Sequence, residues 1–468
     1  MALVLRPYQE NLVNEIRDAM RQHRSNLLRL PTGGGKTAIA TDLCSKAVFK
    51  GNSTYFICHR QELLDQTAKT FRKAGLDYLS FIASGWPHDP RCPIQICSIG
   101  SLSSRLSKVK IPKLALWDEA HHLGAGGWQK VKSAFCSSYH IGLSATPERL
   151  DGKGLGKHFD NMIMGPSESW LIENGYLSDY VIYGPPPPDL GGVHKRMGDY
   201  AKNELAAAMD KSKITGDIIS HWKKHGAGKR TILFAVNVEH SKHMVQQFLA
   251  SGIVAVHLDG ECTHQERRIA ARDFADGKID ILSNVELFGE GYDLSAQADR
   301  DVTVDCVIQA RPTQSLALHR QQVGRCLRPK ADGSKAVILD HAGNAWRLGF
   351  PDDDHPWSLD GVERDRSSKA EKDIAVRVCP KCKGMHKVAP VCKYCGFVYP
   401  VVARVVEQVE GSLEQLDRSS VKAHRMREQA RLKTIDDLVE YGRKRGMKNP
   451  EGWAGHVWTA RQAKRAQR

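Results

Sequence analysis

The feature that most constrains the fold is an alternation of short apolar runs with helical patterns, which occurs twice in succession. Runs of this length bounded by turn residues are typical of buried strands, and their alternation with helices is typical of a parallel sheet. The sequence therefore predicts an α/β fold with two tandem parallel-sheet domains. The expected strands are 26–30, 54–58, 94–98, 114–118 and 139–143 in the first domain, and 231–235, 254–258, 279–283, 304–309 and 336–339 in the second.

A glycine-rich stretch follows the first expected strand and consists of Pro31, Thr32, Gly33, Gly34, Gly35, Lys36 and Thr37. Glycines of this kind let backbone N–H groups close around phosphate oxygens, while Lys36 can reach the outer phosphates and the Thr37 hydroxyl can hold Mg²⁺. Asp118 and Glu119 follow a later strand, where Asp118 can hold Mg²⁺ and Glu119 can polarise a water against the γ-phosphate. Either stretch alone could be an ordinary turn, but together they predict hydrolysis of a nucleoside triphosphate.

Three further motifs follow in order along the chain. Ser144 and Thr146 lie at a strand end, and Gly291 and Asp293 close a later strand and loop. The last motif holds Gln321, Arg325 and Arg328. Because Arg325 and Arg328 are three residues apart, they would share one face of a helix and could clamp a transferring phosphoryl group. A surface helix paired with carboxylates is the alternative.

In this order the motifs resemble those of superfamily 2 helicases, over about residues 1–345. Arg6 and Gln9 match the adenine-recognition segment, 30–37 match motif I, and 118–121 match motif II in its Asp-Glu-Ala-His form. Ser144 and Thr146 match motif III, 281–293 match motif V, and 321–328 match motif VI. The resemblance implies that Ser144 and Thr146 couple ATP hydrolysis to the action on nucleic acid. The resemblance implies two RecA-like domains that bind ATP and Mg²⁺ between them, with Gln321, Arg325 and Arg328 acting from the second domain.

The form of motif VI and the run 144–152 narrow the resemblance to the group that includes type III restriction motor subunits and Ssl2-type DNA repair helicases. The order of parts is most similar to the RadD family of bacterial repair proteins, and a phage or prophage origin fits the differences. The resemblance implies nucleic acid, most simply single-stranded or forked DNA, across both domains. Its expected contacts are Arg60, Gln61, Ser98, Ser101 and Asn237, each of which could instead be a surface or cap residue. An RNA helicase, or a nucleotide-switched subunit of a restriction-like complex, is an open alternative.

Four cysteines stand in two closely spaced pairs near the C-terminal end: Cys379 and Cys382, then Cys392 and Cys395. Two Cys-x-x-Cys turns can place four thiolates around one Zn²⁺, so the spacing predicts a structural zinc module. Two redox Cys-x-x-Cys motifs are the alternative, but neither pair opens the helix of a βαβ unit, where such motifs usually stand.

The chain carries a formal net charge of +15, concentrated near its end. Residues 365–468 hold 23 lysines and arginines against 12 acidic residues, which favours a polyanionic partner such as nucleic acid. A solubilising tail is the alternative, and the tail could also bind replication or repair proteins.

The sequence lacks an apolar run of 18 residues and a secretory h-region, and its other cysteines are scattered singly, so we expect a cytoplasmic protein without membrane contact. The predicted divisions are a first RecA-like domain at 1–165, a connector at 166–211, a second RecA-like domain at 212–345, a linker at 346–375, the zinc module at 376–400 and a helical basic tail at 401–468.

Overall fold

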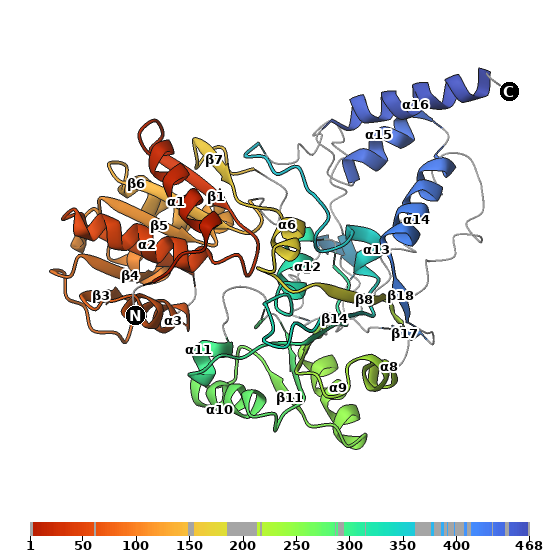
Figure 1. Cartoon of the computed structure of the whole chain (residues 1–468), viewed down its shortest axis with the longest axis horizontal. Helices are drawn as coiled ribbons and strands as arrows, with labels where there is room; N and C mark the ends of the chain where they lie inside the picture. The colour runs from red at the N-terminus through yellow and green to blue at the C-terminus, as the bar shows by residue number, and fades with distance from the viewer. Residues whose placement is uncertain are drawn as a thin grey trace.

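Two α/β domains lie side by side in the structure, a computed structural model, and helices from the C-terminal end lie beside the second domain (Figure 1). The described residues are 3–59, 62–147, 154–184, 213–215, 218–285, 287–288, 294–313, 315–360, 376–378, 385–387, 391, 397, 407–409, 413–432, 434–444 and 449–466.

The first domain is built on a seven-stranded parallel sheet with the strand order β3-β4-β2-β5-β6-β1-β7. The five strands predicted from the sequence are all present, with bounds that differ by at most one residue. The two that were not predicted, β3 and β7, are four-residue strands at the two edges. The strands are β1 (Ser25–Arg29), β2 (Thr54–Cys58), β3 (Leu79–Ile82), β4 (Ile94–Ser98), β5 (Leu114–Asp118), β6 (Tyr139–Ser144) and β7 (Asn161–Met164).

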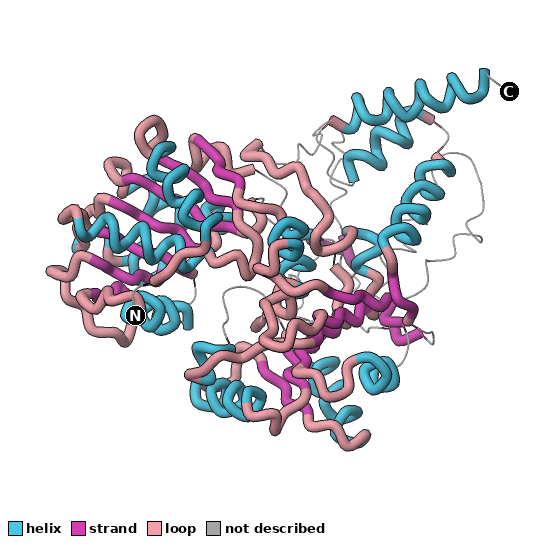
Figure 2. Tube along the Cα trace, in the orientation of Figure 1, coloured by secondary structure: helices cyan, strands magenta, loops and turns pink. Residues whose placement is uncertain are grey.

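Helices pack on both faces of this sheet (Figure 2). Side chains alternate along each strand, so Phe56 and Leu116 point into one core while Ile57 and Trp117 point into the other. The helices α1 (Pro7–Ala19), α2 (Lys36–Phe49) and α3 (Glu62–Lys73) bury their apolar faces in the first of these cores. The second core holds α4 (Ile99–Ser104), α5 (Gly126–Ala134) and the short 3₁₀ helix η2 (Ala120–Gly124), and the 3₁₀ helix η1 (Leu106–Lys108) packs at its margin.

The second domain is also built on a seven-stranded sheet, in the order β11-β12-β10-β13-β14-β8-β18. Six strands are parallel and the edge strand β18 is antiparallel, so the prediction of two parallel-sheet domains is confirmed. The strands are β8 (Tyr180–Gly184), β10 (Thr231–Phe234), β11 (Ala255–Leu258), β12 (Ile281–Asn284), β13 (Cys306–Gln309), β14 (Ala336–Asp340) and β18 (Glu414–Leu416).

Two strands of this sheet come from outside the range 212–345 that the sequence suggested for the second domain. Strand β8 lies in the predicted connector, and β18 lies in the tail at 401–468, which the sequence predicted to be helical. Leu413 and Leu416 are buried in the cores of the second domain, and the exposed edge of β8 offers unpaired backbone groups to β18. This burial and the pairing with the edge of β8 explain why β18 is a strand and not part of a helix.

The helices of the second domain cover both faces of its sheet. The largest core cluster continues from the first domain into the second, where it includes Val323, Leu327 and Ile338. This shared core packs the two domains against each other. The helices are α6 (Glu168–Glu173), which lies between the domains, and α8 (Ile218–His225), α9 (Val238–Ala250), α10 (His264–Ala275), α11 (Leu294–Ala298), α12 (Leu316–Val323) and α13 (Asn344–Leu348).

Outside the two large sheets and their helices, the described residues form two small ladders and three helices. Strands β15 (Val376–Val378) and β16 (Met385–Lys387) pair with each other, and β17 (Glu407–Val409) pairs with β9 (Lys213–Thr215). Helix α14 (Arg418–Arg431) contacts the second domain through the rings of His424 and Trp346. Helices α15 (Ile435–Lys444) and α16 (Pro450–Ala466) pack on each other and stand apart from the two α/β domains in Figure 1.

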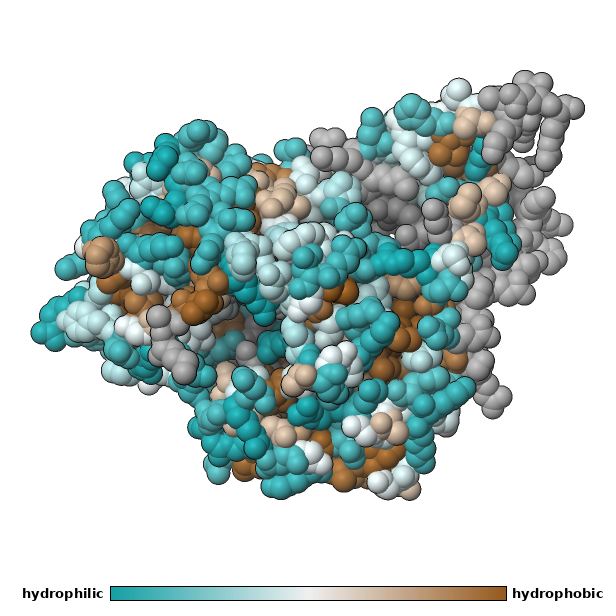
Figure 3. Space-filling model, in the orientation of Figure 1, coloured by the Kyte–Doolittle hydropathy of each residue, from teal (hydrophilic) through white to brown (hydrophobic). Residues whose placement is uncertain are grey.

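The surface and the C-terminal end carry three further observations. Hydrophobic residues on the face in Figure 3 form several small patches among hydrophilic ones. None of the described helices is long and apolar enough to cross a membrane. Cys379, Cys382, Cys392 and Cys395 lie outside the described residues, and the residues that are described contain no cluster of metal-ligating side chains. The predicted zinc module therefore stays a prediction.

Candidate nucleotide-hydrolysis site

The predicted phosphate-binding loop connects the end of β1 to the start of α2. Gly33 and Gly35 adopt positive φ angles of 83° and 87°, which L side chains rarely adopt. Space also requires Gly35, since a Cβ there would lie 2.2 Å from Gln9 Nε2. Lys36 opens α2 and its Nζ donates a hydrogen bond to the Leu30 carbonyl at 3.3 Å. A loop of this shape at a helix N-terminus is suited to bind phosphate oxygens.

The segment that starts α1 packs directly on this loop. The Tyr8 hydroxyl and Gln9 Nε2 both donate to the Gly34 carbonyl, at 2.7 and 3.1 Å. Gln9 Oε1 accepts from the Arg6 backbone N–H at 3.0 Å, and the Arg6 guanidinium lies 5.1 Å from the centre of the Tyr176 ring. The sequence pattern had identified Arg6 and Gln9 but not Tyr8 or Tyr176, because an aromatic side chain gives no local signal of the loop it will contact.

The acidic pair lies at the carboxyl end of β5, in the same sheet as the loop. Burial, followed by the charge of Glu119, raises the pKa of Asp118, and the charge of Lys36 counteracts part of this rise. Glu119 adopts φ +47°, which is uncommon for a residue other than glycine, and is 9% exposed. Its Oε2 accepts no hydrogen bond within the described part of the chain and lies 3.5 Å from His121 Nδ1. That oxygen therefore keeps unused hydrogen-bonding capacity in the interior of the site.

A short hydrogen-bond chain joins the acidic motif to the next one. His121 Nδ1 lies 3.1 Å from Ser144 Oγ, and this hydroxyl donates to the Thr146 carbonyl at 2.8 Å. Ser144 and Thr146 are both buried. A shift of β6 relative to β5 would move Ser144, and with it His121, which lies two residues after Glu119. A coupling role for Ser144 and Thr146 requires a connection of this kind.

The last motif reaches the loop from the second domain. Gly324 caps α12, and a Cβ on it would lie 2.9 Å from the Thr32 Cβ and 3.0 Å from its Cγ2. Gln321 is buried in α12. Arg325 and Arg328 do not share a helical face, because α12 ends at Val323 and both follow the cap. They line a small cavity with residues such as Phe288 and Leu294, and all of its lining residues belong to the second domain.

The expected nucleic-acid contacts are only partly within the described residues. Ser98 is buried at the start of α4 and Ser101 is half-buried within it. Asn237 caps α9, since its Oδ1 accepts from the His240 backbone N–H at 2.7 Å. Arg60, Gln61, Gly291 and Asp293 lie outside the described residues. Their roles stay predictions.

The residues fit a nucleoside triphosphate with Mg²⁺. The glycine loop supplies a phosphate cradle and Lys36 a cation whose described partner is a backbone carbonyl. Thr37 and Asp118 supply oxygen donors of the kind that Mg²⁺ prefers. When bound, Mg²⁺ would offset the repulsion between Asp118 and Glu119 and polarise the phosphoryl oxygens.

Comparison with known proteins agrees with this geometry. Residues 2–149 match the family model described as "Type III restriction enzyme, res subunit", and residues 210–330 match "Helicase conserved C-terminal domain". A 51.5 kDa protein of a Lactococcus phage is 32% identical over 85% of this chain and 83% of its own length.

More distant relatives carry names that include an activity. The Saccharomyces cerevisiae protein named "Putative ATP-dependent helicase IRC3" is 28% identical over 73% of this chain but only 52% of its own length. The DNA 3'-5' translocase XPB2 of Sulfurisphaera tokodaii is 24% identical, over 73% of this chain and 82% of its own length. The solved structure of the restriction-modification enzyme LlaBIII bound to DNA shares the fold, with a TM-score of 0.52 and 16% identity over 74% of this chain and 28% of that enzyme.

Two RecA-like domains with a phosphate-binding loop on one and an arginine motif on the other define an ATP-hydrolysing motor. The chain belongs to superfamily 2 of the helicases, in which it is related to the Ssl2/XPB-like proteins and to the motors of type I and type III restriction enzymes.

Proposed function

We propose that this enzyme is an ATP-driven DNA helicase or translocase, which moves on DNA or remodels it during repair, recombination or replication. The observation that carries the proposal is the approach of Gly324 to Thr32, because it brings the arginine motif of one domain onto the phosphate loop of the other. A site shared between two domains can couple hydrolysis to domain movement. ATP would contact both domains and favour their closed arrangement, whereas the products of hydrolysis would favour it less.

The residues have separate roles in this proposal. The glycine loop and Lys36 bind the phosphates, and Thr37 and Asp118 hold Mg²⁺. Glu119 orients and polarises the attacking water, for which its buried Oε2 is suited because it accepts no hydrogen bond within the described residues. Gln321, Arg325 and Arg328 stabilise the charge that develops on the transferring phosphoryl group. Arg6 and Gln9 bind the base, while Gly291 and Asp293 complete the nucleotide site from motif V.

DNA is the proposed substrate because the DNA 3'-5' translocase XPB2 of Sulfurisphaera tokodaii matches 73% of this chain. Arg60, Gln61, Ser98, Ser101 and Asn237 would contact its backbone, so sequence would have little influence on binding. An excess of basic residues beyond residue 365 favours the same kind of partner.

The remaining features extend the proposal. Cys379, Cys382, Cys392 and Cys395 would bind one Zn²⁺, and with the tail they would give the organisation of RadD-type repair proteins. The similarity to a phage protein supports a phage or prophage origin. We place the enzyme in the cytoplasm, where the tail could also bind replication or repair proteins.

One experiment tests the proposed substrate. Steady-state ATP hydrolysis is measured with single-stranded DNA, duplex DNA, forked DNA and RNA of matched length. The proposal requires that at least one DNA stimulates hydrolysis more strongly than RNA does. Stimulation by RNA alone would assign the enzyme to the RNA helicases, and hydrolysis that no nucleic acid changes would contradict a motor role.

A further inference from the structure

A buried cluster of three charged side chains joins the two halves of the nucleotide site. Arg29 Nη2 lies 2.7 Å from both carboxylate oxygens of Glu168, and Arg320 Nη1 lies 3.2 Å from Oε1 of the same group. All three residues are 9% exposed or less. Two guanidinium groups therefore share one carboxylate in the interior.

The cluster connects segments that carry the proposed chemistry. Arg29 is the last residue of β1, directly before the phosphate loop, and Arg320 lies in α12, four residues before Gly324. Glu168 opens α6, between the two domains. Helix α12 is therefore linked to the phosphate-loop side at two points in its C-terminal half, through the bond of Arg320 to Glu168 and, one turn later, through the Gly324 cap.

A fourth side chain covers both arginines. The Trp357 ring centre lies 5.5 Å from the guanidinium carbons of Arg29 and Arg320, within the range of cation–π attraction. Arg320 also donates to the Asp353 carbonyl, and the Leu359 carbonyl accepts from the Gly156 backbone N–H at 2.8 Å. The segment 350–360 thus runs from the second domain back to the first.

We propose that Glu168 and Arg320 are positioning residues for ATP hydrolysis, because they hold α12, and with it Arg325 and Arg328, in a fixed orientation against the phosphate loop. The inference rests on the proposed function. Neither residue belongs to the phosphate loop, the acidic pair or the arginine pair, so each acts through the arginine motif that follows α12.

The charges of the cluster suggest a variant that separates positioning from folding. Removing Glu168 would leave two buried cations without a counter-ion, which is strongly destabilising. Arg320→Met instead leaves Arg29 and Glu168 as a balanced pair, and methionine fills a similar volume. We expect this variant to fold with a melting temperature close to that of the parent protein.

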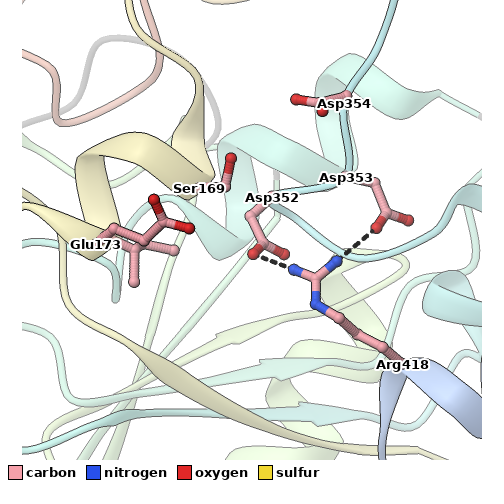
Figure 4. Close-up of a pocket in the computed structure, with 7 residues that line it drawn as sticks. Ser169, Glu173, Asp352, Asp353, Asp354 and Arg418 are labelled. Carbon is pink, nitrogen blue, oxygen red and sulfur yellow. Dashed lines mark hydrogen bonds and ion pairs between the residues drawn. The ribbon is translucent and has the colours of Figure 1, made fainter.

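Arg418→Met is the matched control. Arg418 bonds the same segment as Arg320 but from α14, through the carboxylates of Asp352 and Asp353 (Figure 4). It contacts neither α12 nor the phosphate loop in any described interaction. The same exchange there should leave the basal kcat unchanged.

The experiment measures kcat and KM for ATP, with saturating single-stranded DNA, for the parent, Arg320→Met, Arg418→Met, Arg325→Ala and the double variant Arg320→Met/Arg325→Ala. We expect Arg320→Met to lower kcat at least tenfold while KM changes less than threefold. The double variant should be no slower than Arg325→Ala, because both changes would remove the same stabilisation.

Each alternative outcome has a distinct meaning. A parent-like kcat for Arg320→Met, or losses that multiply in the double variant, would overturn the positioning role. If Arg325→Ala itself has a parent-like kcat, the proposed role of the arginine motif is wrong. Should Arg320→Met fail to fold, Arg320→Lys takes its place, since it keeps the charge but cannot reach both Glu168 and Asp353. A parent-like kcat for that variant would also overturn the proposal.

Discussion

Replacing Gly324 by alanine tests whether the two domains meet at the phosphate loop. Gly324 has φ −56° and ψ −17°, which alanine adopts easily, although an added Cβ would also lie 2.9 Å from the Arg320 carbonyl oxygen. The added Cβ would lie 2.9 Å from the Thr32 Cβ, whereas ordinary contacts between carbon atoms begin about 0.5 Å further apart. The segment around Gly324 must therefore move away from Thr32 by a few tenths of an ångström or more, and Arg325, the next residue, must move with it.

A displacement of this size affects rate more than folding. Misplacement of a catalytic group by about 1 Å can cost about 10²-fold in rate, so we expect kcat for Gly324→Ala to fall by about 10- to 100-fold, or roughly 1.4–2.8 kcal/mol. The melting temperature should change little. Gly126→Ala is the control, because a Cβ there would meet no atom within 4 Å. The assay is DNA-stimulated ATP hydrolysis, and a kcat for Gly324→Ala within threefold of the control would refute the reasoning.

Three further predictions concern the arginine motif, pH and zinc. Alanine at Arg325 or Arg328 should lower kcat by ~10³–10⁵-fold with little change in nucleotide affinity. Steady-state kinetics measure the first quantity and a nucleotide-binding titration the second. A loss of kcat below about tenfold would mean that both arginines have a structural role instead. Burial lowers the pKa of His140 to about 3, and its Nδ1 accepts from Trp117 Nε1 at 3.1 Å, so the folded protein keeps it neutral. Below pH 6.5 the unfolded chain binds a proton there that the folded chain does not, so stability should fall by about 2 kcal/mol from this group between pH 7.5 and pH 5. Denaturant unfolding should show a shallower pH dependence for His140→Gln, and an unchanged dependence would contradict this assignment. Protein purified without chelator should hold one Zn²⁺ per chain by metal analysis, and Cys379→Ser with Cys392→Ser should lose it; metal-free parent protein would contradict the zinc module.

The sheets and the phosphate loop could be predicted because their signals are local. Apolar runs such as 54–58 and 114–118 become central strands, and the glycines before Lys36 belong to one continuous stretch. Short edge strands such as β3 and β18 have weaker signals, since their burial depends on the strand that they join.

The buried cluster could not be predicted, because its members are far apart in the sequence. Arg29 and Glu168 are separated by 139 positions, and Glu168 and Arg320 by 152. Arg29 stands at the end of an apolar run and Glu168 in a segment without clear periodicity, so neither position signals a partner. Arg325 and Arg328 were assigned to one helical face from their spacing, but the glycine between them and α12 ends the helix first.

The measurement that tests the central claim most directly is ATP hydrolysis by Glu119→Gln, with and without single-stranded DNA. Glutamine keeps the size of the side chain but removes the carboxylate that would polarise the water, so nucleotide binding should persist while turnover stops. Lys36→Ala, which should instead weaken nucleotide binding, controls for loss of the site as a whole. We predict DNA-stimulated hydrolysis for the parent protein and none above background for Glu119→Gln. Hydrolysis by Glu119→Gln at the parent rate would contradict the assignment of the acidic pair and, with it, the proposed mechanism.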